Sequence, residues 1–355
     1  MRFIGSKEKL LSFIQTALLN HVRKETSCIG DLFCGTAIVS RLFKRLGYRV
    51  VANDNLNFCY VLAQGTLGIN DEPQFERLIA SGQIHKTEGT ELFPTPYDQV
   101  LNHLNQLSGQ KGFIYREYSP EGTTGSLVQR RYFSDSNAQK IDAIRTKIGY
   151  WQQLGLLDEA EECLLISDLI HATNRVANVA GTYGCFIKHW DPRAHKQLVL
   201  KRSPITPSSM QHEVFLGDAN ALVKQRYFDI LYLDPPYTWR HYGAYYHILE
   251  TIAKGDEPPI TGRTGLRPWN GSKSRYCDRV DAPNALRELV SSARCKHLFL
   301  SYNSEGLISH EAIMEILTQR GNPICYETDY RRYRSNNGGS RENSLKERLY
   351  YVQTG

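Results

Sequence analysis

The segment DILYLDPPYTW, Asp229 to Trp239, joins an apolar run to an acid, two prolines and a tyrosine. A continuous apolar run such as the one ending at Leu233 is typical of a central strand in a parallel sheet. Proline fixes φ at about −65° and has no backbone N–H, so the residues after Asp234 cannot continue the strand. The segment therefore predicts a buried strand that ends in a rigid loop.

Strands and helices alternate before and after a long interruption. Two final strands, Cys325 to Tyr333 and Leu345 to Val352, are joined by a turn-rich stretch and predict an antiparallel pair at the sheet edge. This pattern predicts an α/β fold: a doubly wound, mostly parallel Rossmann-like sheet with an inserted domain. The other expected strands are Cys28 to Phe33, Arg49 to Asn53, Val214 to Leu216 and His297 to Ser301, and the expected helices include Ala37 to Leu46, one starting at about Leu56, and His310 to Leu317.

The interruption is polar, aromatic and rich in turns, with one clear helix near Asn137 to Leu154. A connection of this length inside a compact domain is usually a domain of its own. We therefore expect a catalytic domain formed by residues 1–70 and 208–355, and an inserted domain formed by residues 71–207.

Composition narrows the class of protein. The chain has 355 residues, of which 41% are hydrophobic and 23% charged, an ordinary globular composition. No apolar run approaches the roughly 20 residues of a membrane span, and MRFIGSKEKL lacks the core of a signal peptide. We therefore expect a cytoplasmic protein. The eight cysteines occur singly, without zinc-site spacing, which predicts reduced thiols and no metal site. The net charge of +6 is compatible with a polyanionic partner.

Acidic residues fall at or near the ends of the predicted strands, where open parallel sheets bind their ligands. Asp31 lies in DLFCGTA, where Gly35 permits a tight turn before a helix. Asp54 follows Gly35 by nineteen residues, a spacing that suits an acid bound to a ribose diol. The GxGxxG fingerprint of dinucleotide enzymes is absent, so S-adenosylmethionine (SAM) is favoured over a nicotinamide cofactor. Asp31 then suits the ammonium group of SAM, and Asp218 its adenine amino group.

Asp234 and the carbonyl of Pro235 form two adjacent, stiffly held hydrogen-bond acceptors. The amino group of a nucleobase is a poor nucleophile, because its lone pair is delocalised into the ring. Two acceptors, one for each N–H, would aim that lone pair at an electrophile such as the methyl group of SAM. This chemistry depends on positioning and electrostatics and requires no metal. Tyr237 offers a face for stacking a base that has left the duplex.

Together these motifs resemble the Dam-type adenine-N6 DNA methyltransferases, the alpha order of amino-methyltransferases. RFIGSK at Arg2 to Lys7 resembles their N-terminal SAM motif, DLFCGTA the glycine motif, VVANDNLN the ribose acid, FLGDA the adenine contact and DPPY the catalytic motif. LSYNSEGL and YRRYRSN resemble the late motifs of the target-base pocket. The resemblance implies that Asp234, Pro235, Pro236 and Tyr237 are catalytic, and that SAM is bound by Phe3, Gly5, Lys7, Asp31, Phe33, Gly35, Thr36, Asp54, Asp218 and Asp234.

The resemblance also implies that the insertion is a target-recognition domain for double-stranded DNA. The segments from Arg130 to Arg145 and from Gly181 to Lys196 resemble parts of members that read non-palindromic sites, for which a monomer suffices. Basic side chains position phosphates, and Arg or Asn side chains read base edges. A separately encoded cognate restriction endonuclease is a further candidate partner, and nucleoid association is expected on DNA. The expected DNA contacts are Arg130, Arg131, Tyr183, Lys188, Arg193, Arg334 and Asn336.

The stretch from Gly255 to Arg279 is rich in glycine, proline and arginine and supports two interpretations. Either its basic residues close over bound DNA, or it is a disordered loop. The residues concerned are Arg263, Arg267, Lys273, Arg275 and Arg279.

Several functions remain in competition with DNA adenine methylation. RNA guanine-N2 methyltransferases share a similar DPPY pattern, but usually lack both the RFIGSK arrangement and a large insertion. Cytosine-N4 relatives typically carry Ser where Asp234 stands. A DNA-binding protein without catalysis is disfavoured because DPPY is intact. The function expected from the sequence is SAM-dependent methylation of adenine N6 in double-stranded DNA at a specific site.

Overall fold

The computed structural model describes residues 3–22, 28–84, 94–239, 241–268, 273–331 and 344–354. The chain forms two compact units, each assembled from separate stretches of sequence. We call them the sheet unit and the helical unit. The sheet unit comprises Ile4–Ala63, Ser208–Gly243 and Asn270–Gly355, and the helical unit comprises Met1–Phe3, Gln64–Pro207 and Ala244–Trp269.

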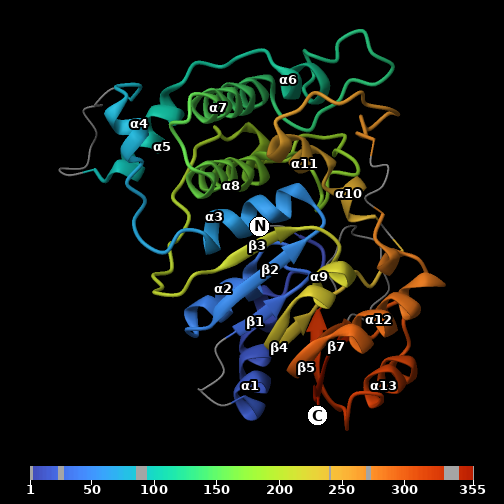
Figure 1. The fold of residues 1–355 in the computed structure, drawn as a ribbon. Helices are drawn as coiled ribbons and strands as arrows, with labels where there is room; N and C mark the ends of the chain where they lie inside the picture. Colours follow the sequence, from blue (N-terminus) through green and yellow to red (C-terminus); the bar gives the residue numbers. More distant parts are fainter. Residues whose placement is uncertain are drawn as a thin grey trace. The chain divides into compact units, whose positions relative to one another are not determined.

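A seven-stranded sheet forms the centre of the sheet unit (Figure 1). The strand order is β3-β2-β1-β4-β5-β7-β6; the first five strands in this order are parallel, and β7 runs antiparallel to both β5 and β6. The predicted doubly wound, mostly parallel α/β fold is thereby confirmed. The strands are β1 (Cys28–Asp31), β2 (Arg49–Asp54), β3 (Glu213–Leu216), β4 (Tyr227–Leu233), β5 (Arg294–Asn303), β6 (Ile324–Arg331) and β7 (Ser344–Gln353).

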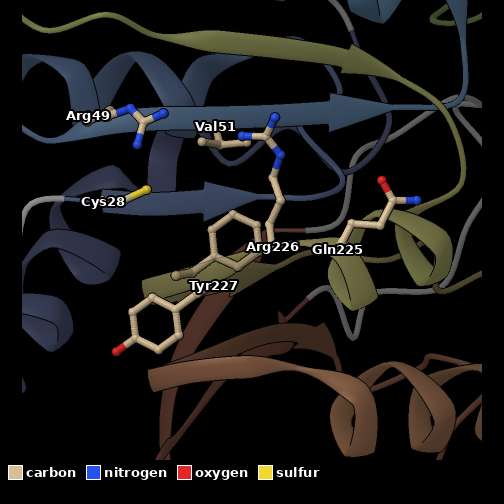
Figure 2. Close-up of a pocket in the computed structure, with 7 residues that line it drawn as sticks. Cys28, Arg49, Val51, Gln225, Arg226 and Tyr227 are labelled. Carbon is tan, nitrogen blue, oxygen red and sulfur yellow. The ribbon is translucent and has the colours of Figure 1, made fainter.

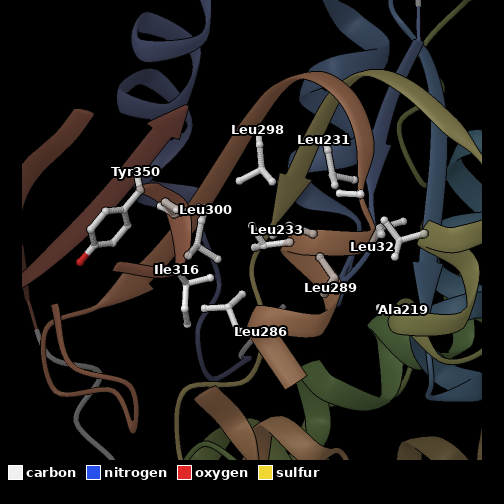
Figure 3. Close-up of a cluster of buried hydrophobic side chains, with 14 of the residues drawn as sticks. Leu32, Ala219, Leu231, Leu233, Leu286, Leu289, Leu298, Leu300, Ile316 and Tyr350 are labelled. Carbon is white, nitrogen blue, oxygen red and sulfur yellow. The ribbon is translucent and has the colours of Figure 1, made fainter. Parts of the chain in front are cut away.

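Strand β4 is continuous and apolar because it lies inside the sheet, paired with β1 on one side and β5 on the other. Helices cover the sheet, and part of its core is seen in Figure 3. There Leu286 and Leu289 pack with Leu231, Leu233 and Leu300, all of them buried. Each such leucine contributes about 1.5–3 kcal/mol through burial.

The helices of this unit connect and flank the strands. The predicted helix after Gly35 is α2, and the predicted helix after β5 is α13. The helices of the sheet unit are η1 (Glu8–Leu10), α1 (Leu11–His21), α2 (Ile38–Arg45), the first part of α3 (Asn57–Leu67), α9 (Ala219–Gln225), the start of α10 (Tyr242–Tyr245), η3 (Arg275–Cys277), α12 (Asp281–Ser292) and α13 (His310–Thr318).

Gly30 in β1 allows a close approach within the core. A Cβ atom at this position would lie 2.7 Å from the ring of Phe228 on β4. Real Cβ atoms do not approach carbon that closely, so any side chain here would displace the ring or the strand. The absence of a side chain at Gly30 therefore lets the Phe228 ring pack directly against β1, at the residue that precedes Asp31.

The helical unit contains more helix than the sequence suggested. We expected one helix near Asn137 to Leu154, and this is α7 (Asp135–Gln153). A second helix, which we did not predict from the sequence, is α8 (Glu159–Val176); it is almost as long and begins with a capping box between Asp158 and Glu161. That box was the sequence signal for α8. The other helices are the end of α3, α4 (Glu76–Ala80), α5 (Pro96–Gln106), α6 (Phe113–Tyr118), η2 (Pro192–His195), the end of α10 and α11 (His247–Lys254).

Segment Ala244–Trp269 follows the DPPY loop in sequence but packs with residues 64–207. Arg145 on α7 donates hydrogen bonds to the carbonyls of Ile252 (2.7 Å) and Ala253 (3.3 Å) at the end of α11. The compact helical unit is thus wider than the 71–207 stretch picked out in the sequence. Among the described helices, none combines the length and the apolar character needed to cross a membrane.

Candidate active site

Three carboxylates lie at the carboxyl edge of the sheet, where the parallel strands β1, β2 and β4 end. Asp31 is level with Ala52 on β2 and with Tyr232 on β4. Asp54 and Asp234 each lie two residues beyond those partners. The sheet register therefore brings Asp31, Asp54 and Asp234 to one edge, as the positions of the strand ends predicted.

The glycine turn after β1 positions Asp54. Gly35 has φ of +52°, in the left-handed region that favours glycine, and its N–H donates to Asp54 Oδ2 at 2.9 Å. The N–H of Leu56 donates to Asp54 Oδ1 at 3.1 Å. Burial raises the pKa of Asp54 to about 6, against the lowering effect of these N–H groups. Thr36 lies within this turn, and Phe33 packs edge-on against Tyr276, with ring centroids 5.0 Å apart.

Asp31 is buried with half of its carboxylate unsatisfied. Ser40 Oγ donates to Oδ2 at 2.5 Å, whereas Oδ1 accepts no hydrogen bond from the residues that the structure describes. Burial raises the pKa of Asp31 to about 7. Buried polar atoms normally have a partner. An orphaned carboxylate oxygen of this kind fits a cationic donor such as an ammonium group.

Asp234 forms a buried cluster with Lys7 and Glu347. Lys7 Nζ lies 3.1 Å from Asp234 Oδ1 and forms a short hydrogen-bonded ion pair with Glu347 Oε1. The side chains of Lys7 and Glu347 are each 3% exposed, and that of Asp234 is 16% exposed. Burial works to lower the pKa of Lys7, but the two carboxylates outweigh it and leave that pKa well above its usual value.

The electrostatics of Asp234 differ from those of an ordinary ion-paired acid. Burial raises its pKa to about 7; Lys7 acts in the opposite direction, and Glu347 adds to the rise. The approach of Lys7 to Oδ1 is an ion pair rather than an aligned hydrogen bond, and Oδ1 accepts none from the described part of the chain. A basic carboxylate oxygen with unused lone pairs suits the acceptance of an N–H bond.

Two other predicted motifs support the DPPY loop. A Cβ at Gly5, whose φ is +78°, would lie 3.2 Å from Tyr237 Oη, so the N-terminal segment passes directly beside this ring. The carbonyl of Tyr237 accepts the N–H of Leu307 at 3.1 Å, and its ring meets Tyr302 edge-on at 6.3 Å. Pro235 is buried, and Pro236 is half-buried. The structure thus brings Gly5, the DPPY loop and Leu307 together within the sheet unit.

Two predicted cofactor residues have local structural roles. Asp218 is exposed and caps α9, where its Oδ1 accepts the N–H of Ala221 at 2.9 Å. Phe3 belongs to the helical unit and stacks on Tyr246, with ring centroids 4.8 Å apart.

The structure places several predicted DNA contacts inside the helical unit. Tyr183, one of the expected DNA contacts, has a fully buried side chain, a position that does not agree with that expectation. Arg130 is only 12% exposed and donates to the Glu117 carboxylate and to the carbonyl of Gly262. Arg193 is 14% exposed and donates to the carbonyl of Val179. The Tyr183 side chain is therefore enclosed, and the Arg130 and Arg193 guanidinium groups are engaged with carbonyls of the helical unit.

Other predicted contacts remain accessible or fall outside the described structure. Lys188 is exposed, and Arg131 is half-buried with Nη1 donating to the Lys188 carbonyl at 3.0 Å. Arg334 and Asn336 lie outside the described residues.

The basic residues after Gly255 are mostly paired. Arg267 is buried, with Nη2 2.8 Å from Asp256 Oδ2, so it does not act as a free arm that closes over DNA. Arg275 is ion-paired with Glu288 at 2.7 Å, and Lys273 with Asp278 at 3.7 Å. Arg263 and Arg279 are exposed.

Sequence reasoning missed Glu347. The available signal was a carboxylate in the middle of SLKERLYY, at a strand position whose same-face neighbours are the apolar Leu345 and Leu349. A charge placed on the inward face of a strand requires a buried partner. Nothing in the sequence showed that this partner is Lys7, 340 residues away.

A hollow of about 420 Å³ lies at the other end of the strands (Figure 2). Cys28, Arg49 and Tyr227, which line it, begin β1, β2 and β4. Arg49 and Arg226 are both ion-paired with Glu213. The hollow is therefore remote from the acids at the carboxyl edge. Within the described residues, no group of three or more His, Cys, Asp or Glu side chains is arranged to hold a metal ion.

Sheet order, glycine turn and acids at the strand ends together define a doubly wound α/β enzyme of the class that binds a nucleoside cofactor at the carboxyl edge. The chain belongs to the D12 class N6 adenine-specific DNA methyltransferase family, whose sequence model matches residues 3–316.

Similar proteins include type II methyltransferase M.FokI of Planomicrobium okeanokoites, 38% identical over 99% of this chain and 52% of that protein. Modification methylase StsI of Streptococcus sanguinis is 37% identical over the same shares. The chain thus spans about half the length of these two relatives. Type II methyltransferase M.NlaIII of Neisseria lactamica is 35% identical over 99% of this chain and 98% of that protein. A SAM-dependent methyltransferase structure from Agrobacterium tumefaciens aligns with 98% of this chain and 62% of its own, at 11% identity and a TM-score of 0.33.

Proposed function

We propose that this chain is a site-specific DNA methyltransferase that transfers a methyl group from SAM to N6 of a flipped-out adenine in double-stranded DNA. The observation that carries the proposal is the Asp234 carboxylate, fixed at the end of β4 and next to Lys7, with Oδ1 free of hydrogen bonds from the described residues. The family and the names of the relatives, type II methyltransferases, support the same activity.

The residues at the carboxyl edge fit SAM. Asp31 Oδ1, the buried oxygen without a described partner, would accept from the ammonium group. Asp54, held by Gly35 and Leu56, keeps lone pairs for the ribose hydroxyls. Asp218, at the end of β3, is retained as the proposed adenine contact through the oxygen that does not cap α9. SAM, when bound, supplies an electrophilic methyl group on a positively charged sulfur.

The DPPY loop then orients the target amino group. Asp234 and the carbonyl of Pro235 each accept one N–H, which directs the nitrogen lone pair toward the methyl group. Methylated nitrogen sheds a proton, and a carboxylate with a pKa raised to about 7 can hold it. Pro236 stiffens the loop, and Tyr237 stacks on the base that has left the duplex. Metal chemistry is not required for these steps.

Residues 71–207 are proposed as the target-recognition part and residues 1–70 and 208–355 as the catalytic part. Lys188 and Arg131, which lie side by side in sequence-distant loops of the helical unit, are the proposed phosphate contacts that the structure leaves accessible. We further propose that the protein acts as a monomer in the cytoplasm and joins the nucleoid on DNA. A cognate restriction endonuclease encoded separately is its proposed partner in the cell.

The test is incubation with methyl-labelled SAM and unmethylated plasmid, digestion to nucleosides and mass spectrometry of the labelled base. We expect N6-methyladenine, equal yields with and without EDTA, and mapped positions that share one recognition sequence. Label on cytosine would show that the target base is cytosine rather than adenine. Label confined to RNA in a parallel reaction would favour guanine-N2 chemistry instead.

A further inference from the structure

Lys7 is shared between two carboxylates of different accessibility. Its ammonium forms the shorter contact with Glu347 Oε1 and stands 3.1 Å from Asp234 Oδ1. Glu347 is almost completely buried, whereas Asp234 retains some exposure. The inner carboxylate therefore anchors the lysine, and the outer one is left at the edge of the sheet where a substrate arrives.

The sheet fixes Glu347 in this place. Strand β7 runs antiparallel to β5, so the beginning of β7 lies beside the end of β5, and Glu347 is directly opposite Asn303. Asn303 Nδ2 donates to Glu347 Oε2 at 3.2 Å, and Ser301 Oγ donates to Oε1 at 3.2 Å. Three donors thus converge on a carboxylate that has little access to water.

The arrangement has a chemical consequence for Asp234. If Lys7 had only one carboxylate to pair with, its N–H groups would turn to Asp234 and occupy the oxygen that an amino group needs. Glu347 takes the short, aligned hydrogen bond, and Asp234 Oδ1, 3.1 Å from the ammonium, keeps no aligned donor among the described residues. The cluster keeps a net negative charge, because it contains two carboxylates and one ammonium group.

We propose that Glu347 is a positioning residue for methyl transfer, which holds the Lys7 ammonium so that Asp234 stays free to accept the N–H of the target amino group. This inference rests on the proposed function, because it assigns Glu347 a role in that reaction. Glu347 does not touch the substrate; it acts through Lys7.

The charges that face Asp234 come from several elements. Lys7 from the N-terminal segment lowers the pKa of Asp234, although burial is the larger influence and raises it, and Glu347 from β7 raises it further. Asp31 on β1 also faces Asp234: burial is the main cause of its raised pKa, and the Asp234 charge raises that pKa further. Tyr237 and Tyr232 stand near the lysine. Of these groups, only Glu347 offers a negative charge that can be removed without touching the proposed cofactor or base contacts.

The test is the pH profile of kcat for Glu347→Gln. With the glutamate charge gone, Lys7 pairs with Asp234 alone and lowers the pKa of Asp234. The acid limb, meaning the pH range in which kcat rises as Asp234 ionises, should therefore move to lower pH by about one unit. The plateau of kcat should fall by no more than about tenfold, because a one-unit change in the basicity of the acceptor limits the loss. KM for DNA should stay unchanged.

The matched control is Glu327→Gln, which removes an ion-paired glutamate on β6 that contacts Lys346 and Arg348 rather than Lys7. It should leave the acid limb in place. An acid limb for Glu347→Gln that stays where the wild type has it, even with a lower rate, would show a purely structural role and overturn the proposal.

Glu347→Asp covers the case in which Glu347→Gln does not fold. It keeps the charge but withdraws it from Lys7 by one methylene, so the acid limb should move in the same direction by a smaller amount. A lower rate with an unmoved acid limb would again overturn the proposal. A wild-type protein that yields no N6-methyladenine would instead refute the proposed function, before any variant is compared.

Discussion

Replacing Asp234 by asparagine should abolish methylation and make the protein more stable above neutral pH. The substitution keeps the shape of the side chain and removes its charge. The folded state holds Asp234 with a pKa of about 7, raised from 3.8 chiefly by burial. The folded protein therefore binds more protons than the unfolded chain between about pH 4 and pH 7, and its stability falls as the pH rises through that window.

The size of the effect follows from that window. A difference of about three pH units between the two pKa values corresponds to on the order of 4 kcal/mol at pH 8. The side chain is 16% exposed, so solvent screening reduces the expected gain to about 2–4 kcal/mol. Lys7 keeps its ion pair with Glu347 in the variant, which prevents the loss expected for an abandoned buried charge. For a chain of 355 residues, a gain of this size should raise Tm by about 3–5 °C.

The assay is thermal unfolding of wild type and Asp234→Asn at about pH 8 and about pH 4.5, with methylation measured in parallel. We expect a higher Tm for the variant at the alkaline pH and nearly equal values at the acid pH. Asp329→Asn, at an exposed position on β6, serves as the control and should change neither Tm nor the methylation rate. A variant that is equally destabilised at both pH values, or that still methylates DNA, would refute the view of Asp234 as a costly ionised acceptor.

Three further predictions test the site and its support. The kcat of the wild type should fall below about pH 7, because burial raises the pKa of Asp234 to about 7 and the acceptor must be ionised; a rate that is flat down to about pH 5.5 contradicts this. Gly30→Ala should lower stability by about 1–3 kcal/mol through overlap with Phe228. Gly217→Ala, whose Cβ would meet its nearest neighbour at 3.9 Å, should be close to neutral, and equal Tm losses in both variants would argue against the overlap. Tyr237→Ala should reduce kcat/KM by a factor equivalent to about 1–3 kcal/mol through lost stacking, and an unchanged value would remove Tyr237 from the site.

Local patterns were sufficient to predict the sheet and its acids. The apolar run before Asp234 and the glycine turn before α2 predicted strands that end at one edge, and β1, β2 and β4 end there. Once these strands are taken to be parallel, their terminal acids are expected to lie together, since the carboxyl ends of parallel strands meet at the same edge of the sheet. The antiparallel pair β6 and β7 was predicted from two strands joined by a turn-rich stretch, and it is present.

Accessibility was harder to predict than structure. Basic and aromatic residues in the insertion predicted DNA contacts, yet Tyr183 is buried, and Arg130 and Arg193 are only partly exposed and donate hydrogen bonds within the helical unit. The same residue types serve as surface contacts and as internal ties, because a guanidinium group can donate hydrogen bonds to a backbone carbonyl as well as to a phosphate. Composition alone does not distinguish the two uses.

The sequence by itself determined the class of fold, the acids at the strand ends and the rigid DPPY loop, since each depends on residues close together in the chain. The tertiary structure decided what surrounds Asp234. It joined Lys7, near one end of the chain, to Glu347, near the other, because β7 is inserted antiparallel beside β5 and delivers its first residues to the catalytic edge. Charge balance at a buried site depends on such distant partners. It is therefore a property of the folded sheet rather than of any single motif.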